Sequence, residues 1–382
     1  MMELLPKTLY IDFVAKRHFF AAISALSMAV SIALFVVIGP NWSIDFTGGT
    51  EVEVHFEEAT EIGEVRAAMA NMGVGEDAVQ AVGTGTSTYL VRVQGLSGGD
   101  EAELAEVKAA LATAFGADWV NEFRVDAEVG TRAAVLYNGA PMPGTSIEAA
   151  LAGLPEVKVQ ASPEENTFYL RLPGVAEQIR DVLTEQMAAK KPVIDRADSV
   201  GPKVGGNLRE AGLVSLLITM GLLLVYVAIR FDFTFAPGAI LCLFHDAILT
   251  VGVWVLFRQE FGLPMISAIL TLVGYSLNDT IVVYDRIREN LEKYRKADLG
   301  KLINDSINQT LSRTIITSGA TALALLPFLF LGGQVLNQFA KAMLIGMVFG
   351  SYSTIYIASP LMLLLKENQD RILGLLGVKS AA

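Results

Sequence analysis

The sequence predicts an α-helical membrane protein with six transmembrane helices and an external α+β region of two tandem βαββαβ modules. Three observations lead to this fold class. First, 52% of the 382 residues are hydrophobic and the mean hydropathy is +0.46, which is typical of integral membrane proteins. Second, six apolar stretches are long enough to cross a hydrocarbon core of about 30 Å. Third, a long polar stretch between the first two alternates between strand and helix patterns.

Charge separates these two parts of the chain. Residues 41–210 carry 27 acidic and 13 basic side chains, whereas the remaining residues carry 13 acidic and 16 basic ones. This acidic balance argues against nucleic acid as a partner. The single cysteine, Cys242, lies in an apolar run, so no disulfide framework is predicted.

We expect residues 1–18 to form a basic, cytoplasmic N-terminal segment and residues 19–39 to form the first transmembrane helix. A cleaved signal peptide is the alternative, but the apolar run exceeds the roughly 7 to 15 residues of such peptides. The motif Asp45-Phe46-Thr47-Gly48-Gly49 follows. Its glycine pair allows a tight turn before the next strand.

Residues 40–130 and 131–205 are each predicted to form one external module. In both, the pattern runs strand, helix, strand, strand, helix, strand, which is the ferredoxin-like order. The expected elements of the first module are 51–56, 61–72, 78–82, 89–93, 100–115 and 121–127. Those of the second are 133–137, 146–154, 157–161, 167–172, 175–187 and 193–197. Chance similarity of two amphipathic segments is the alternative.

Residues 206–366 are predicted to hold the second to sixth transmembrane helices, after a hinge at 200–210 whose glycines and proline break regular structure. The longest connection is expected to be a loop at residues 285–308 with six basic side chains, and a polar tail follows at 367–382. Basic residues concentrate on the side of the termini. The positive-inside rule therefore places both termini, this loop and the tail in the cytoplasm, and the acidic region in the periplasm of a Gram-negative cell.

The fourth apolar stretch contains an acid, Asp279, next to Asn278. A charge inside hydrocarbon costs roughly 2.5 to 3.5 kcal/mol on insertion scales, so this carboxylate needs a partner, water or a proton. Arg313 on the fifth stretch is expected at a similar depth. A buried carboxylate next to an arginine keeps its charge, and away from it takes up a proton, so this pair could couple protonation to helix movement. A static salt bridge is the alternative.

Four more polar residues are candidates for the same path or for plain helix contacts. His245 and Asp246 lie on the third stretch, and the imidazole could relay protons. As helix neighbours they should point about 100° apart, so they should not form a catalytic dyad by themselves. Asp285, at the inner end of the fourth stretch, could instead reach the membrane interface. Thr317 could line a wet path or form hydrogen bonds between helices.

Several of these stretches carry a resemblance to a known family. The segments at 45–50 (DFTGGT), 200–205 (VGPKVG), 245–246 (HD), 274–290 (GYSLNDTIVVYDRIREN) and 311–314 (LSRT) resemble the SecF side of the SecD/SecF protein-export membrane proteins, which are similar to resistance-nodulation-division exporters. The resemblance covers the whole membrane portion in order. It implies that the proton-path acid is Asp279 and the path arginine Arg313, with a further path acid in SecD. Family members usually have one small external module, whereas two are predicted here.

The resemblance implies an accessory subunit that uses the proton gradient to assist preprotein movement through the SecYEG channel in the bacterial inner membrane. The expected partners are SecD, SecYEG, YidC, YajC, unfolded preprotein and the lipid bilayer. We expect a transport subunit, not an enzyme, with no metal or cofactor; the sequence has no Walker-type phosphate loop. The alternatives are half of a proton-driven small-molecule or lipid exporter, and a structural scaffold. An intramembrane hydrolase built on His245 and Asp246 lacks a nucleophile at a suitable spacing.

Overall fold

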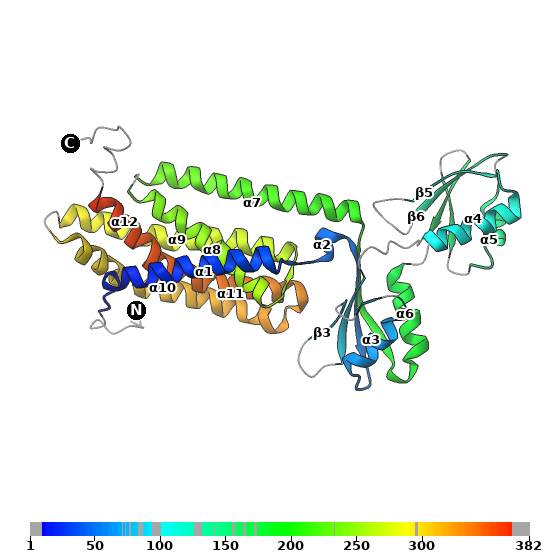
Figure 1. The fold of residues 1–382 in the computed structure, drawn as a ribbon, viewed down its shortest axis with the longest axis horizontal. Helices are drawn as coiled ribbons and strands as arrows, with labels where there is room; N and C mark the ends of the chain where they lie inside the picture. Colours follow the sequence, from blue (N-terminus) through cyan, green and yellow to red (C-terminus); the bar gives the residue numbers. More distant parts are fainter. Residues whose placement is uncertain are drawn as a thin grey trace. The chain divides into compact units, whose positions relative to one another are not determined.

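The computed structural model describes residues 10–368 apart from 71, 73, 76–77, 83–86, 94–100, 126–131, 141, 155–156, 163–165, 172–173, 233 and 295–296. The outer parts of the predicted N-terminal segment and tail therefore lie outside the described residues. The chain divides into two compact units, a helical unit formed by residues 1–41 and 212–382, and an α/β unit formed by residues 42–211. Figure 1 shows the chain in sequence colours.

Six helical segments of the described chain are long and apolar enough to cross a membrane. They are α1 (Arg17–Val37), which follows a short 3₁₀ turn at Val14–Lys16, α7 (Pro202–Arg230), α8 (Ala236–Leu256), α9 (Leu263–Lys293), α10 (Leu299–Leu331), and α11 (Gly333–Ser353), which continues through a π-helical turn (Thr354–Ala358) into α12 (Ser359–Glu367). Short strands lie at Asn41–Trp42 (β1) and Glu260–Phe261 (β10). The predicted number of spans is confirmed.

Helix α9 lies at the centre of the helical unit and packs against α8, α10 and α11. Large side chains from α8 and α9, such as Trp254, Met265 and Tyr284, are fully buried. In contrast, α1, α7 and α10 leave many apolar side chains exposed, such as Val37, Ile229 and Leu331. Exposed apolar surface on spanning helices is suited to lipid or to another membrane protein.

Two predicted irregular segments are helical instead. Most of the loop expected at 285–308 belongs to α9 and α10, which run to Lys293 and start at Leu299. Polar contacts hold these two extensions together: Asn290 Nδ2 donates to Ser306 Oγ at 2.8 Å, and Arg286 Nε donates to Gln309 Oε1 at 2.6 Å. The hinge expected at 200–210 is also mostly helix, because α7 starts at Pro202, and proline suits the first helical turn.

The α/β unit contains two four-stranded antiparallel sheets. The first has the order β3-β4-β2-β9, with strands at Val79–Ala81, Thr88–Val93, Gly49–Phe56 and Pro192–Val200. Two helices pack on this sheet, α3 (Ile62–Ala70) and α6 (Val175–Gln186). A 3₁₀ turn at Ala188–Lys190 follows α6. Its core joins Val52, Val54 and Met69 from the early segment with Ile179 and Leu183 from α6.

The second sheet has the order β5-β6-β8-β7, with strands at Val120–Val125, Arg132–Tyr137, Thr167–Arg171 and Lys158–Ala161. Helices α4 (Glu101–Phe115) and α5 (Gly144–Ala150) accompany it. Its separate core contains Val107 and Leu111 from α4 together with Val135, Ile147 and Leu170.

This pairing shows that the predicted tandem division is wrong. The strand expected to complete the first module, β5, pairs with β6, and the strand expected to complete the second, β9, pairs with β2. Each sheet keeps the strand order of a βαββαβ unit, but the two units exchange their last helix and strand. Residues 94–174 are therefore inserted within the first unit, between β4 and α6.

The glycine pair predicted to form a turn does so. Ser43 caps the short helix α2 (Ile44–Thr47), its side chain accepting from Asp45 N at 3.1 Å. Gly48 and Gly49 then have φ values of +72° and +126°, a region that favours glycine. A Cβ on Gly205, at the start of α7, would lie 2.8 Å from Gly48 N. The motif therefore brings the entry and exit of the α/β unit into close backbone contact.

Candidate functional site

Asp279 is a buried acid on the central helix α9, with 8% of its surface exposed. Thr314 Oγ1 on α10 donates to Asp279 Oδ1 at 2.7 Å. The second oxygen, Oδ2, is also buried and has no hydrogen-bond partner among the described residues. Half-satisfied buried carboxylates are uncommon because an unpaired charged oxygen is costly to remove from water. Asp279 is therefore placed to exchange a proton or a partner.

Arg313, the predicted partner, lies close enough to interact electrostatically with Asp279. Its side chain is exposed on α10, and the described residues show no ion pair between the two groups. Asn278 is exposed as well. Thr317 Oγ1 donates to the carbonyl oxygens of Arg313 and Thr314 on its own helix, at 2.9 and 3.1 Å. The structure thus brings Asp279 to Thr314 and leaves Arg313 free to face outward.

His245 and Asp246 form a second buried cluster, both with no exposed surface. Their side chains do meet, contrary to the expectation from helix geometry: His245 Nδ1 lies 2.9 Å from Asp246 Oδ1. Asp246 Oδ2 accepts from Ser276 Oγ on α9 at 2.5 Å and from Ser353 Oγ on α11 at 2.9 Å. This cluster joins three helices, and its carboxylate has partners on both oxygens.

The predicted edge residue Asp285 takes part in an ion pair. Arg230 Nη2, at the end of α7, lies 2.7 Å from Asp285 Oδ1 and 2.8 Å from Oδ2. Both side chains are partly exposed. This pair connects the end of α7 to α9, which continues beyond Asp285 to Lys293; the interface position expected for Asp285 stays a prediction.

The π-helical turn after α11 lies next to the same central helix. Thr280 on α9 is hydrogen-bonded to Thr354 at 2.8 Å, and Tyr284 OH donates to Ala358 O at 3.0 Å. Such turns occur frequently at functional sites because they interrupt the regular helical hydrogen bonds. Helix α9 therefore has polar contacts with α10 through Asp279, with α8 through Ser276, and with the continuation of α11 through Thr280 and Tyr284.

The hydroxyl groups that complete these clusters, those of Thr314, Ser276 and Ser353, were not predicted from the sequence. Hydroxyls in spanning helices also bond to their own backbone, as Thr317 does, so the sequence alone does not single out the bridging ones. Within the described ranges, no three His, Cys, Asp or Glu side chains gather as a metal site requires. The expected lack of a metal and of a cofactor stays a prediction.

Two family models match the chain. The model described as protein export membrane protein SecD/SecF, C-terminal, matches residues 180–368, and the SecD/SecF GG motif model matches residues 33–60. The first match contains Asp279, Thr314 and the His245–Asp246 cluster. The second contains the turn at Gly48 and Gly49.

Individual proteins are similar over most of the chain. The protein translocase subunit SecF of Desulfurispirillum indicum is 32% identical over 356 residues, covering 92% of this chain and 91% of the relative. That of Thermodesulfovibrio yellowstonii is 42% identical over 223 residues, covering 57% and 74%. The crystal structure of SecDF from Thermus thermophilus, described as a translocon-associated membrane protein, is similar with a TM-score of 0.64 and 30% identity. The match covers 94% of this chain but 39% of SecDF.

Proposed function

Because this chain belongs to the SecD/SecF family of protein-export membrane proteins, on the SecF side, we propose that it is an accessory subunit of the Sec translocase. In this proposal it is a transport subunit without enzymatic activity or a bound cofactor, and the proton gradient supplies the energy. It assists the movement and release of unfolded preproteins across the bacterial inner membrane. The relatives named protein translocase subunit SecF, which match nearly the whole chain, support this role.

The observation that carries the proton-driven part of this proposal is the half-satisfied carboxylate of Asp279. An acid with one bonded and one unpaired oxygen, buried between two spanning helices, can gain a proton without breaking a complete network. One charge that crosses 100 mV releases about 2.3 kcal/mol. The transfer of a few protons is sufficient to shift the equilibrium between two helix arrangements whose free energies differ by a few kcal/mol.

The partner in this cycle is SecD. In Brucella abortus the two proteins are one chain, and this chain is 33% identical to that SecDF over 361 residues while covering 38% of its length. The exposed position of Arg313 on α10 suits contact with such a partner, and the resemblance assigns a further proton-path acid to SecD. SecYEG, YidC and YajC are the other proposed partners, with both termini in the cytoplasm and the α/β unit in the periplasm.

The test is gradient-dependent preprotein release by Asp279→Asn. The full chain is reconstituted with SecD and SecYEG, and the late release of a preprotein is measured with the proton gradient intact and after its collapse by an ionophore. We expect the wild type to be stimulated by the gradient and the variant to release at the collapsed-gradient rate. Glu289→Gln, an acid-to-amide change in the exposed end of α9, is the matched control and should keep full stimulation. Normal stimulation of Asp279→Asn would contradict the proposal.

A structural scaffold is the second candidate, and the His245–Asp246 cluster favours it. Both carboxylate oxygens of Asp246 are bonded, and the cluster ties α8, α9 and α11 together, as a static contact would. In that case release would depend on the presence of the protein but would be equal with and without the gradient.

A further inference from the structure

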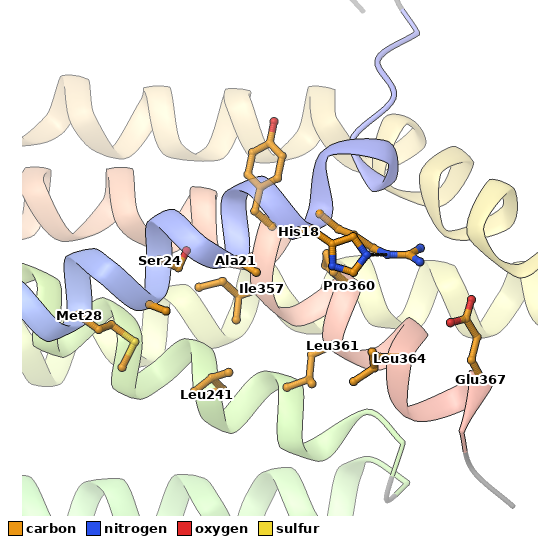
Figure 2. A pocket seen from close by; sticks show the side chains of 13 residues that line it. His18, Ala21, Ser24, Met28, Leu241, Ile357, Pro360, Leu361, Leu364 and Glu367 are labelled. Atoms are coloured by element: carbon orange, nitrogen blue, oxygen red, sulfur yellow. Dashed lines mark hydrogen bonds between the residues drawn. The ribbon is translucent and has the colours of Figure 1, made fainter. Parts of the chain in front are cut away.

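A cavity of about 330 Å³ lies within the helical unit between α1, α8 and the final helical segment. Its walls are mostly apolar and include Ala21, Ala25, Met28, Leu241, Leu361 and Leu364. Its volume falls in the range of about 300 to 1,000 Å³ that ligand sites occupy. Figure 2 shows the lining of the cavity, with Met28 at one end and Glu367 at the other. None of the residues of the proposed proton path lines it.

The sequence of α1 explains why this space exists. Ala21, Ala25 and Met28 follow the spacing of one helix face, and two of these three side chains end at Cβ. Farther along the helix, α1 packs directly against α8, where Gly252 faces Ser31 with no room for a Cβ. Small residues therefore open the cavity toward the start of α1, while close packing ends it toward the middle.

The length of the cavity matches one leaflet of a bilayer. From His18 to Met28 the helix advances ten residues, which is about 15 Å at 1.5 Å per residue. A hydrocarbon core is about 30 Å thick, so this is half of it. A single extended acyl chain of about this length suits the mostly apolar walls.

The mouth of the cavity carries charges of both signs. Arg17 and His18 lie at the start of α1, and Glu367 lies at the end of α12. Arg17 Nε donates to His18 Nε2 at 3.4 Å, and within the described residues neither Arg17 nor Glu367 forms an ion pair. A guanidinium group recognises phosphate through paired hydrogen bonds. A carboxylate beside it is suited to a primary ammonium group and repels a second anion.

We propose that this cavity binds an aminophospholipid, a lipid of the phosphatidylethanolamine type, with one acyl chain along Ala21, Ala25 and Met28. Arg17, supported by His18, holds the phosphate, and Glu367 holds the ammonium group. The lipid fills the space between α1 and α12 and connects the first and last spanning segments. The site does not depend on the proposed role in protein export.

Native mass spectrometry of the full-length, delipidated protein tests this binding. Equal amounts of phosphatidylethanolamine and phosphatidylglycerol are added, and the lipids retained on the protein are counted. The wild type should retain one tight phosphatidylethanolamine in preference to phosphatidylglycerol. Arg17→Gln should weaken retention of both lipids about tenfold, the loss expected for a charged hydrogen-bonded contact. Glu367→Gln should keep the binding but abolish the preference.

Matched changes on the same helix provide the controls. Ala21→Phe fills the cavity and should abolish the tight lipid, whereas Ala22→Phe, on an exposed neighbour outside the cavity, should not. Lys16→Gln removes a nearby positive charge outside the cavity and should leave the preference unchanged. Equal retention by Ala21→Phe and the wild type, or a wild type that binds both lipids equally, overturns the proposal. A photo-crosslinker at position 25 that captures a polypeptide in native membranes also overturns it.

Discussion

The helical unit contains two buried acids whose carboxylate oxygens differ in their hydrogen bonds. Asp246 has hydrogen-bond partners on both oxygens, whereas Asp279 has a partner on one. Because an unpaired buried oxygen costs free energy that a bonded one does not, Asp279 has more to gain from a proton or a new partner. At the residue scale this difference supports the proposal that Asp279 exchanges a proton, whereas Asp246 holds helices together.

Thr314→Val tests the contact that holds Asp279. The change keeps the shape of the side chain but removes the only donor to the carboxylate among the described residues. A hydrogen bond to a charged group is worth about 1.5 to 3 kcal/mol, so we expect gradient-stimulated preprotein release to fall about tenfold. Thr317→Val is the matched control, because that hydroxyl bonds to its own helix, and it should stay near wild type. Equal activities of the two variants would show that the Thr314 contact is dispensable.

Asp279 could be predicted from the sequence because a carboxylate in an apolar stretch is conspicuous. Its partner could not, since the sequence favoured Arg313 by charge, while the structure bonds Asp279 to the next residue, Thr314. Which of two neighbouring helix residues faces α9 depends on the rotation of α10, and that is decided by packing along the whole helix. Local sequence does not contain this information.

Gly205→Ala tests the close approach at the glycine motif. A Cβ at Gly205 would lie 2.8 Å from the backbone nitrogen of Gly48, so backbone must shift. Overpacking of this kind costs about 1 to 3 kcal/mol, and we expect a lower unfolding temperature for the purified protein in detergent. Gly206→Ala has no atom within 4 Å of the new Cβ and should be neutral. A variant at 205 as stable as that at 206 would contradict this contact.

At the scale of helices and strands, the sequence predicts the elements well and their pairing badly. Nearly all the strands and helices expected between residues 51 and 197 exist, because alternation and helical spacing are local signals. The exchange of β5 and β9 is not local. β9 has nine residues and pairs along all of β2, which has eight, while β5 and β6 both have six. Pairing strands of equal length satisfies more backbone groups.

The exchanged pairing can be tested by a disulfide between β2 and β9. Thr50 and Ser199 are direct cross-strand partners, and their hydroxyl groups are 2.8 Å apart. We expect Thr50→Cys with Ser199→Cys to cross-link under mild oxidation, because opposite Cβ atoms in such pairs are about 4.5 to 5.5 Å apart. Thr50→Cys with Glu122→Cys, a β2–β5 combination that the tandem arrangement would permit, should not. Mobility on a non-reducing gel distinguishes them, and the reverse pattern would restore the tandem arrangement.

The helix extensions at 285–308 show a similar limit. Charged residues in this segment indicate a loop when judged by hydropathy alone, yet α9 continues to Lys293. The charged side chains pair along the helix surface, as Arg286 and Glu289 do at 2.6 Å, and such pairs at a spacing of three residues support helices. Hydropathy therefore predicts the apolar part of a helix but not the residue at which the helix ends.

At the scale of the whole molecule, the α/β unit has two separate hydrophobic cores that are built from different segments of the chain. The first core draws on residues 52–93 and 175–194, and the second on residues 107–170. A segment that forms its own core can be removed with little loss to its host. The first sheet therefore keeps all of its own core residues without residues 94–174.

Replacement of residues 94–174 by a linker of about six residues tests this organisation. The remaining order β2-α3-β3-β4-α6-β9 is an uninterrupted βαββαβ unit, so we expect slow amide exchange in β2 and β9 both of this variant and of the intact chain. Removal of residues 131–205 is the matched control, because it follows the tandem division but takes α6 and β9 from the first core. That variant should exchange rapidly in β2. The two variants should differ because the first sheet needs β9, its distant last strand. Equal amide protection of β2 in both variants would show that the first sheet does not need β9.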